Sequence, residues 1–395
     1  MKKLNVLLIS SWYPSKEHPT LGNFVQKHAE AINELVNLKV LFVTPSTTLK
    51  SDFTVENSIN NKVDTTIVYY HETKQSIPII STIKSAIRYK KAFKIGLKAI
   101  QTSTNFKQID ITHCNVTFQS SLFANYLKNK HSIPYLITEH STVFSNKKNV
   151  FRNIPFAQKI LIQIGIKNAS AIAPVSIQLK NDMLSLGLKN DYHVIANIID
   201  TKLFKPKQTQ SSKKATILHI SHLDNQQKNS LGILTVIKKL SEQRQDFVLR
   251  IIADDNIEYA ETLIKSLNIP KSVVQLDTIK STTEVARAYQ DASFFLLYSN
   301  YETFSVVLAE AWSSGLPVVY SKCGGLTELN DKKLGIQIQP KDDEILLKSL
   351  HQMLDNYHQY DSNLIREFAI SKFDKQSVAI AYLKLYQKII KANEV

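Results

Sequence analysis

The stretch "SNYETFSVVLAEAWSSGLPVVYS" (299–321) contains two carboxylates, Glu302 and Glu310, eight positions apart. It continues the apolar run "ASFFLLY" (292–298) and ends in a second apolar run, "PVVYS" (317–321), and both runs are typical of buried strands. Strand, turn, helix and strand in succession indicate an α/β fold with a parallel sheet. Because ligands bind outside the carboxyl ends of parallel strands, Glu302 is a candidate for a binding site.

The same alternation extends over the whole chain. In the first half, apolar runs predict strands at 4–11, 38–45, 65–72, 108–114, 134–140, 169–176 and 192–198. In the second half, they predict strands at 215–223, 246–254, 272–279, 292–299, 317–321 and 334–340. The segments between them, such as 281–291, have helical periodicity, so we expect parallel sheets.

The segment 201–215 divides these elements into two groups, because it is polar, contains Pro206 and has no hydrophobic period. A chain of 395 residues also suits two domains better than one core. We therefore expect two α/β domains of similar size with a cleft between them.

The composition indicates a folded protein with an anionic partner. Hydrophobic residues make up 43%, and the net charge of +15 is concentrated in residues 1–200, with 24 Lys or Arg against 12 Asp or Glu. Such a surplus suggests nucleic acid, phosphate groups or a lipid surface as partner. The two cysteines, Cys114 and Cys323, have no metal-ligand spacing and favour a reducing compartment. No apolar run is long enough for a membrane-spanning helix, and we interpret the apolar start as a strand rather than a signal peptide.

The turn after the strand at 292–299 has features of a phosphate site, although the chain lacks a G-x-G-x-x-G or P-loop motif. The backbone N–H groups of Thr303, Phe304 and Ser305 would open a helix, whose positive end favours an anion. Glu302 and Glu310 could then reach hydroxyl groups on either side of that anion. A nucleotide sugar has this layout, with sugar hydroxyls, a diphosphate and ribose hydroxyls.

The motif as a whole resembles the signature of the family-four retaining glycosyltransferases, which have the GT-B fold of two Rossmann-like domains. The matching residues are Glu302, Glu310-Ala311, Gly315-Leu316-Pro317-Val318-Val319 and Gly324-Gly325-Leu326-Thr327-Glu328. Further matches are the first loop at Gly22 and Asn23, the strand ending in His140, the domain-closing segment at 175–188 and 194–206, and the lysine Lys228. The last helix, about 376–395, resembles the one that crosses back to the first domain in this fold.

The resemblance implies an acceptor-binding domain at 1–205, completed by the last helix, and a nucleotide-sugar donor-binding domain at 206–375. It implies sugar transfer with retention and without a metal or other cofactor. Lys228 and the helix start at Ser305 would stabilise the leaving diphosphate, Glu302 would hold sugar hydroxyls and Glu310 ribose hydroxyls. His140 would contact the sugar, and Glu328 is a secondary candidate for sugar or ribose contact.

The chain also departs from the family pattern. Ser221-His222-Leu223 stands where the family has an Arg that neutralises the diphosphate, so His222 is a candidate for that role. Asp254-Asp255 replaces a glycine-rich turn and invites a metal interpretation, but no third ligand has suitable spacing.

Simpler interpretations remain open for each residue. Glu310 could be a solvated carboxylate on a helix face, and His140 could be hydrogen-bonded within the core. Lys228 could be an exposed lysine at a helix start, and Glu328 could cap a helix after Gly324-Gly325. Two other functions also remain open. A nucleotide-sugar epimerase or hydrolase of the same fold would need no acceptor, and a nucleic-acid-binding protein would explain the charge, although no nucleic-acid motif is present.

The segment 81–100 predicts a basic amphipathic helix, with Lys84, Arg88, Lys91 and Lys98 at helical spacing and no acidic residue. It would suit the anionic surface of a membrane, as expected for a cytoplasmic enzyme at the inner face of the plasma membrane that uses a lipid-linked acceptor in polysaccharide or lipopolysaccharide assembly. It would equally suit an ordinary helix with its apolar stripe in the core and its basic face in water.

Overall fold

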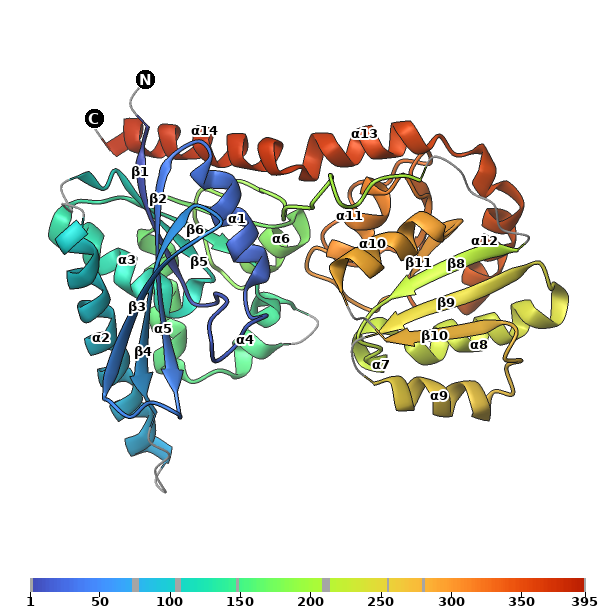
Figure 1. Ribbon diagram of the computed structural model, residues 1–395, viewed down its shortest axis with the longest axis horizontal. Helices are drawn as coiled ribbons and strands as arrows, with labels where there is room; N and C mark the ends of the chain where they lie inside the picture. The colour runs from blue at the N-terminus through green and yellow to red at the C-terminus, as the bar shows by residue number, and fades with distance from the viewer. Residues whose placement is uncertain are drawn as a thin grey trace. The chain divides into compact units, whose positions relative to one another are not determined.

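The structure is a computed structural model that describes residues 3–72, 78–103, 108–146, 149–207, 214–253, 256–278 and 281–393. The chain forms two compact units, each built around one sheet (Figure 1). Unit 1 comprises Met1–Ile198 and Val378–Val395, and unit 2 comprises Ile199–Ser377.

Unit 1 has a seven-stranded sheet in the order β3-β4-β2-β1-β5-β6-β7, in which only the pair β3 and β4 is antiparallel. The strands are β1 (Asn5–Ser10), β2 (Asn37–Ser46), β3 (Phe53–Asn60), β4 (Val63–His71), β5 (Ile111–Asn115), β6 (Tyr135–Glu139) and β7 (Ala171–Pro174). The helices are α1 (Asn23–Asn33), α2 (Pro78–Ser103), α3 (Thr117–His131), α4 (Val150–Asn153), α5 (Phe156–Asn168), α6 (Ile177–Ser185) and α14 (Lys375–Asn393).

Helices cover both faces of this sheet. Along β1, Val6 and Leu8 belong to the core cluster that contains residues of α1 and α14, whereas Leu7 and Ile9 belong to the cluster that contains residues of α2. Successive side chains of a strand point to opposite faces, so a strand buried on both sides reads as one continuous apolar run. This explains why the run at 4–11 predicted β1 correctly.

Unit 2 has a six-stranded parallel sheet in the order β10-β9-β8-β11-β12-β13. The strands are β8 (Ala215–Ile220), β9 (Phe247–Ala253), β10 (Val274–Thr278), β11 (Phe294–Leu297), β12 (Val318–Ser321) and β13 (Gly335–Ile338). The helices are α7 (Asn225–Lys228), α8 (Ser230–Gln243), α9 (Ile257–Ser266), α10 (Thr282–Asp291), α11 (Val306–Ser313), α12 (Asp343–Asn356) and α13 (Ser362–Phe373).

The structure differs from the sequence prediction in three elements. β3 was missed, because its residues are mostly exposed and give no apolar run, and its antiparallel pairing makes the first sheet mixed. The segment 192–198 is not a strand. It runs beside β7, but that strand ends at Pro174, which has no N–H to continue a ladder. The helix expected to open at Thr303 begins at Val306.

The apolar side of α2 lies mainly in the core. Phe93, Leu97 and Ile100 are buried against the sheet, while Ile87 remains 63% exposed. Ile83 also belongs to the apolar stripe of 81–100, but its side chain lies outside the described residues. The apolar stripe predicted for 81–100 is therefore largely used for packing, and the exposed part of the helix is chiefly its basic face. Within the described ranges, every helix is too short or too polar to span a bilayer.

Two tyrosines of α14 form hydrogen bonds to residues of the sheet of unit 1. The hydroxyl of Tyr386 lies 2.6 Å from Nδ1 of His113, and the hydroxyl of Tyr382 lies 3.1 Å from Oγ1 of Thr138 and 3.3 Å from Nδ1 of His28. Burial lowers the pKa of both His28 and His113 to about 3, so both rings are neutral in the folded protein.

These two histidines make the stability of unit 1 depend on pH. Their folded-state pKa values lie below the ordinary value, so stability is present above about pH 6.5 and is lost as the pH falls toward the folded-state values. Lowering the pH from about 7 to about 5 should cost roughly 2 kcal/mol for each histidine. We expect His28→Gln to flatten this dependence in urea unfolding experiments. His18→Gln, in an exposed loop, should leave it unchanged, and equal slopes for both variants would contradict the assignment.

Candidate functional site

The order of strands in unit 2 reverses between β8 and β11. The chain moves outward from β8 through β9 to β10 on one side, and from β11 through β12 to β13 on the other. Connections on the two sides of such a reversal leave the sheet toward opposite faces, so the carboxyl ends of the two central strands are open to a ligand. The loops after β8, β11 and β12 carry most of the residues predicted for the donor.

Two features of the loop after β8 determine the position of Lys228. The carboxylate of Asp224 accepts a hydrogen bond from the N–H of Gln226 and so caps the single turn of α7, which ends at Lys228. The next residue, Asn229, has φ of 54° and separates α7 from α8. Asparagine tolerates this left-handed conformation better than most residues, which explains the sequence Lys-Asn at this position.

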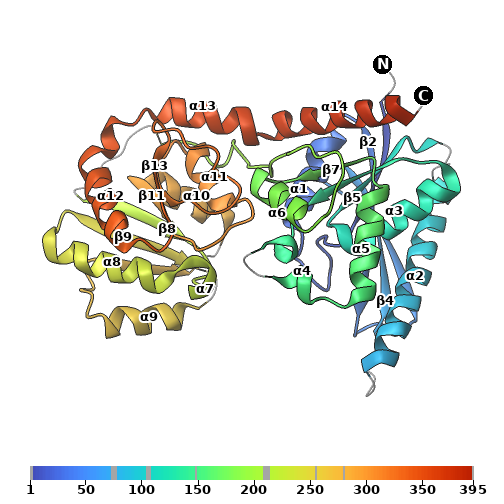
Figure 2. The same ribbon diagram turned by 180° about the vertical axis from the view of Figure 1, so that it is seen from behind.

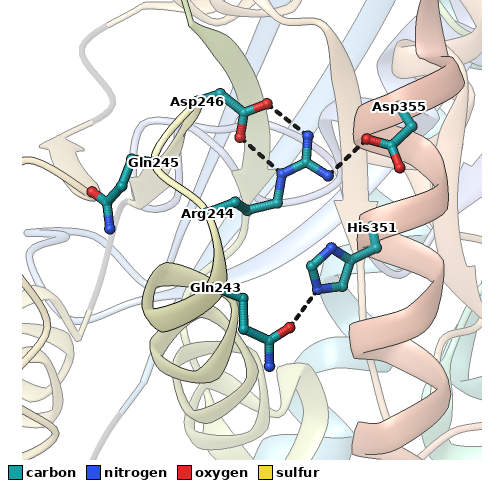
Figure 3. A pocket seen from close by; sticks show the side chains of 6 residues that line it. All are labelled: Gln243, Arg244, Gln245, Asp246, His351 and Asp355. Atoms are coloured by element: carbon teal, nitrogen blue, oxygen red, sulfur yellow. Dashed lines mark hydrogen bonds and ion pairs between the residues drawn. The ribbon is translucent and has the colours of Figure 1, made fainter.

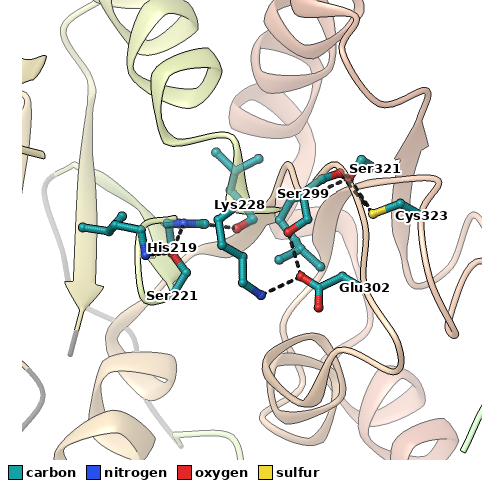
Figure 4. A network of polar contacts seen from close by, with 10 residues as sticks. His219, Ser221, Lys228, Ser299, Glu302, Ser321 and Cys323 are labelled. Carbon is teal, nitrogen blue, oxygen red and sulfur yellow. Dashed lines mark hydrogen bonds and ion pairs between the residues drawn. The ribbon is translucent and has the colours of Figure 1, made fainter. Parts of the chain in front are cut away.

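Lys228 and Glu302 form a buried ion pair (Figure 4). Nζ of Lys228 lies 2.6 Å from Oε1 of Glu302, and the two side chains are only 9% and 6% exposed. Asn300 joins their loops, because its N–H donates to the carbonyl of Gln227 and its side-chain amide to that of Gln226. The structure therefore brings together two residues that the sequence had assigned to different parts of the donor.

A second set of contacts fixes the position of Glu302. The hydroxyl of Ser299 donates to Oε1 of Glu302 at 2.7 Å, and the carbonyl of Ser299 accepts from Ser321 at 2.6 Å and from the thiol of Cys323 at 3.0 Å (Figure 4). Gly324 has φ of 80°, and a Cβ there would lie 2.4 Å from Cβ of Glu302. The first glycine of the Gly-Gly pair is thus required by the close approach of the Glu302 loop.

The start of α11 combines a helix N-terminus with an unsatisfied polar atom. Ser305 is the N-cap residue, with φ of 75°, and its hydroxyl is buried without a hydrogen-bond partner among the described residues. Free N–H groups and the helix dipole favour an anion at this end. The side chain of Phe304 points elsewhere, since it is buried against Phe373, and Thr303 is half-buried in the preceding bend.

Glu310 is not a solvated carboxylate. It is buried in α11, and its Oε2 lies 3.2 Å from the hydroxyl of Tyr289, which is also 2.9 Å from the carbonyl of Val307. Burial, followed by the charge of Glu310, raises the pKa of Tyr289, which therefore remains a neutral hydrogen-bond donor. A buried carboxylate beside a strand reversal, in contact with a neutral phenol, is a candidate for a ligand contact rather than a surface charge.

The remaining donor candidates are more exposed. His222 is half-buried, and only its carbonyl has a described partner, the side-chain amide of Asn256. Glu328 is exposed in a turn, so no helix follows Gly324-Gly325 for it to cap. The neighbouring His219 is fully buried, with its ring nitrogens 2.9 Å from the carbonyl of Leu296 and 2.8 Å from Oγ of Ser221.

Unit 1 has a comparable site where its strand order reverses, between β1 and β5. His140 follows the adjacent β6, and its ring lies 4.5 Å from that of Phe24, which also contacts Trp12. Gly22 has φ of 73°, and a Cβ there would lie 2.6 Å from the carbonyl of Trp12. Asn23, exposed at the first position of α1, completes this loop.

His140 is held as a neutral imidazole. Burial is the main cause that lowers its pKa well below the usual value, with smaller contributions from His28 and His113. Its Nε2 lies 3.2 Å from Oδ1 of Asn115. The preceding residue, Glu139, accepts hydrogen bonds from the N–H groups of His140, Ser141 and Thr117 and so fixes the turn that carries the ring.

Sequence reasoning missed several of these supporting residues. Asn300 and Ser299 lie inside the quoted motif, but nothing in their spacing indicated that they orient Lys228 and Glu302. Glu139 could have been found, because an acid at the end of an apolar strand needs several hydrogen-bond donors when it is buried. For His219, the sequence indicates a position in a strand but no supporting role at the site.

A pocket of about 590 Å³ in unit 2 is lined by polar side chains that pair with one another (Figure 3). Arg244 pairs with Asp246 and Asp355 at 2.6 and 2.8 Å, and Gln243 lies 2.7 Å from His351. Arg244 lowers the pKa of Asp246, as expected for a surface ion pair. In the part of the chain that is described, no group of three or more His, Cys, Asp or Glu is arranged to hold a metal, and Asp254-Asp255 lies outside it.

Comparison with known proteins gives two family matches that together cover most of the chain. Residues 30–203 match the model described as Glycosyltransferase Family 4, and residues 200–368 match that described as Glycosyl transferases group 1. An uncharacterized glycosyltransferase of Methanocaldococcus jannaschii is 23% identical over 70% of this chain and 75% of its own length. An uncharacterized protein in the cps region of Klebsiella pneumoniae is 24% identical over 71% of this chain and 80% of its own.

Three solved structures share the fold. Sucrose-phosphate synthase from Thermosynechococcus elongatus aligns with a TM-score of 0.73 at 17% identity, covering 99% of this chain and all of its own. Anabaena HepE in complex with UDP aligns with a TM-score of 0.72 at 14% identity, and the lipopolysaccharide outer core galactosyltransferase WaaB with 0.67 at 17%. Each covers 98% of this chain and is covered completely. The chain has the GT-B fold and belongs to the family-four, or group 1, glycosyltransferases, a retaining family that transfers sugars from nucleotide donors and typically needs no metal.

Proposed function

We propose that this glycosyltransferase moves a sugar, with retention, from a nucleoside-diphosphate sugar to a glycan or lipid-linked glycan acceptor in surface polysaccharide assembly. The observation that carries the proposal is the buried pair of Lys228 and Glu302 at the strand reversal of unit 2. A buried lysine at an open strand end is suited to bind an anion, and the adjacent carboxylate is suited to bind hydroxyls.

Residues 206–375 would bind the donor, and residues 1–205 with the helix at 376–395 would bind the acceptor. An ammonium group has three N–H donors, so Lys228 can hold Glu302 and still donate to the leaving diphosphate. The hydroxyl of Ser305 and the first N–H groups of α11 would stabilise the same charge. His222 would add a weaker, pH-dependent cation in place of the missing arginine.

In the proposed reaction, the bond between the anomeric carbon and the diphosphate oxygen breaks, and a bond to the acceptor oxygen forms on the same face. The acceptor hydroxyl gives its proton to the departing phosphate. Glu302 would orient sugar hydroxyls, Glu310 ribose hydroxyls, and Glu328 would be a secondary contact. The neutral ring of His140 can accept from or donate to a sugar hydroxyl without a charge of its own.

The relatives support a donor and an acceptor class. The HepE structure is a complex with UDP, so we propose uracil as the first base to test. WaaB is a lipopolysaccharide outer core galactosyltransferase and the Klebsiella relative is encoded in a cps region, which support an acceptor in surface polysaccharide assembly. Both cysteines are buried thiols, which supports the proposed cytoplasmic location.

A thermal-shift screen with UDP, GDP, ADP and their common sugars tests the donor. A ligand at 100 times its dissociation constant should raise the free energy of unfolding by about 2.7 kcal/mol. Product analysis with and without candidate acceptors then separates transfer from epimerisation or hydrolysis, which need no acceptor. Stabilisation by none of the nucleotides would refute the proposed donor class.

Glu302→Gln should lower turnover at least about a hundredfold and also destabilise unit 2 by about 3 kcal/mol, because it leaves Lys228 buried without its counter-charge. The double variant Lys228→Met/Glu302→Gln should recover most of the stability but none of the turnover. The exposed pair Lys207 and Asp291 provides the control, since Lys207→Met/Asp291→Asn should change stability by less than about 1 kcal/mol. A double variant with normal turnover would show that the pair is only structural.

Glu310→Gln should weaken nucleotide binding at least about tenfold, the usual loss for a charge-assisted hydrogen bond, while the fold persists. Tyr289→Phe removes the neighbouring hydroxyl and keeps the carboxylate, so it should bind the nucleotide nearly normally. Calorimetric titration with the nucleotide from the screen measures both. Equal affinities for Glu310→Gln and wild type would remove Glu310 from the donor site.

His140→Ala should lower turnover about a hundredfold and change donor affinity much less, because its contact is proposed to be with the reacting sugar. His193→Ala, which alters a half-buried histidine in unit 1, should change neither. Steady-state kinetics combined with nucleotide titration separate the two effects. Normal saturated turnover together with lost donor affinity would reverse the role assigned to His140.

A further inference from the structure

Three helices of unit 1 form a surface with an unusual charge pattern. The sequences of α2, α3 and α5 contain ten Lys or Arg and no Asp or Glu. By contrast, α9 and α12 of unit 2 carry acidic residues among their basic ones. The three helices lie side by side in Figures 1 and 2. Phe93 of α2 stacks on Phe123 of α3 at 3.6 Å, and Gly165 of α5 lies against Ser121 of α3.

A largely apolar pocket of about 710 Å³ lies among these helices. We call it the aromatic pocket; its lining includes Tyr89, Phe93, Phe118, Phe123, Tyr126 and Leu161. Lys90 and Lys94, both exposed on α2, stand at its edge, and Glu72 is the acidic residue in the described lining. Its size suits the buried part of a small ligand, and its walls suit hydrocarbon.

The outward face of α5 continues this apolar surface. Phe156 is 77% exposed, and Ile160, Leu161 and Ile164 are also exposed, while Ile162 and Ile166 on the opposite face are buried. Large apolar side chains gathered on an exposed helix face mark a binding surface, so this face of α5 points to a binding partner. Leu161 belongs both to the exposed face and to the lining of the aromatic pocket.

The exposed lysines and apolar side chains of this surface together favour a lipid as its partner. Exposed lysines beside an apolar face match a lipid whose phosphate lies next to its hydrocarbon chain. Nucleic acid would fit the charge but would leave the exposed aliphatic side chains of α5 against water. An acidic peptide would not need a pocket lined by five aromatic rings.

We infer that the aromatic pocket holds the hydrocarbon chain of an anionic, phosphate-bearing lipid, with Lys90 and Lys94 beside its phosphate and the apolar face of α5 set into the bilayer. This inference deepens the proposed function and rests on it. Residues of unit 1 are proposed to bind the acceptor, and the inference favours an acceptor that is linked to a lipid. It differs from docking by the segment 81–100 alone, since most of the apolar stripe of α2 is used in the core.

Co-sedimentation with vesicles tests the inference without any turnover. The wild type should bind vesicles of phosphatidylcholine mixed with phosphatidylglycerol much more tightly than phosphatidylcholine alone. Lys90→Gln and Lys94→Gln should each weaken binding about fivefold at low ionic strength, which corresponds to about 1 kcal/mol per charge. Phe156→Ser/Ile164→Ser should weaken it at any ionic strength, because apolar contacts are not screened by salt.

A third variant tests occupation of the aromatic pocket itself. Ala86 is an exposed lining residue on α2, so Ala86→Trp should fill the pocket and leave the fold intact. It should keep the salt-sensitive attraction to anionic vesicles but weaken the salt-resistant part, of which the α5 face still supplies a share. The matched control is Ile177→Ser/Leu184→Ser, which removes two exposed apolar side chains from α6 of the same unit and should bind as the wild type does.

Several outcomes would overturn the inference. They are no binding to anionic vesicles, equal binding to both kinds of vesicle, unaltered binding by Ala86→Trp, or an equal loss in the α6 control. A wild-type dimer that Phe156→Ser/Ile164→Ser converts to a monomer would show that a second copy covers the face instead. Nucleotide stabilisation is measured on the same samples, so that failure to bind lipid with normal nucleotide binding rejects only this inference.

Discussion

The reversal of strand order in each sheet determines where this chain can hold reactive side chains. Helices that follow the strands on either side of the reversal cover opposite faces, so the loops at that point diverge and leave their backbone N–H groups and side chains open. In unit 2 the reversal lies between β8 and β11, whose loops carry Lys228 and Glu302. In unit 1 it lies between β1 and β5, next to the loop at Gly22 and to His140.

The contacts around Glu302 show what such an open site requires. A buried ion pair contributes little net stability, because the loss of hydration offsets the attraction of its charges. The chain nevertheless holds Lys228 and Glu302 together with Asn300 and Ser299, and Gly324 allows the Glu302 loop to approach. So much support for a pair of low net stability is expected when the charges serve a ligand rather than the fold.

Much of this fold could be predicted from the sequence, because strands covered on both faces appear as continuous apolar runs. β1 and β11 were found in this way, whereas β3 was missed since it lies at an exposed edge and is mostly polar. The signature residues predicted the family. The ion pair between Lys228 and Glu302 could not be predicted, because it depends on how Asn300 joins two loops that are far apart in sequence.

The two halves of the chain differ in their surplus of basic residues, and the range over which charges attract each other explains the difference. Residues 1–200 have a surplus of 12 basic residues, whereas the rest of the chain has a surplus of only 3. A single diphosphate is best held by one desolvated cation at close range, and Lys228 is suited to this without a basic surface around it. An extended anionic surface instead attracts many exposed lysines, each weakly and within a Debye length. The acid-free helices α2, α3 and α5 have the second pattern, which is the one expected for the anionic lipid proposed as partner of this surface.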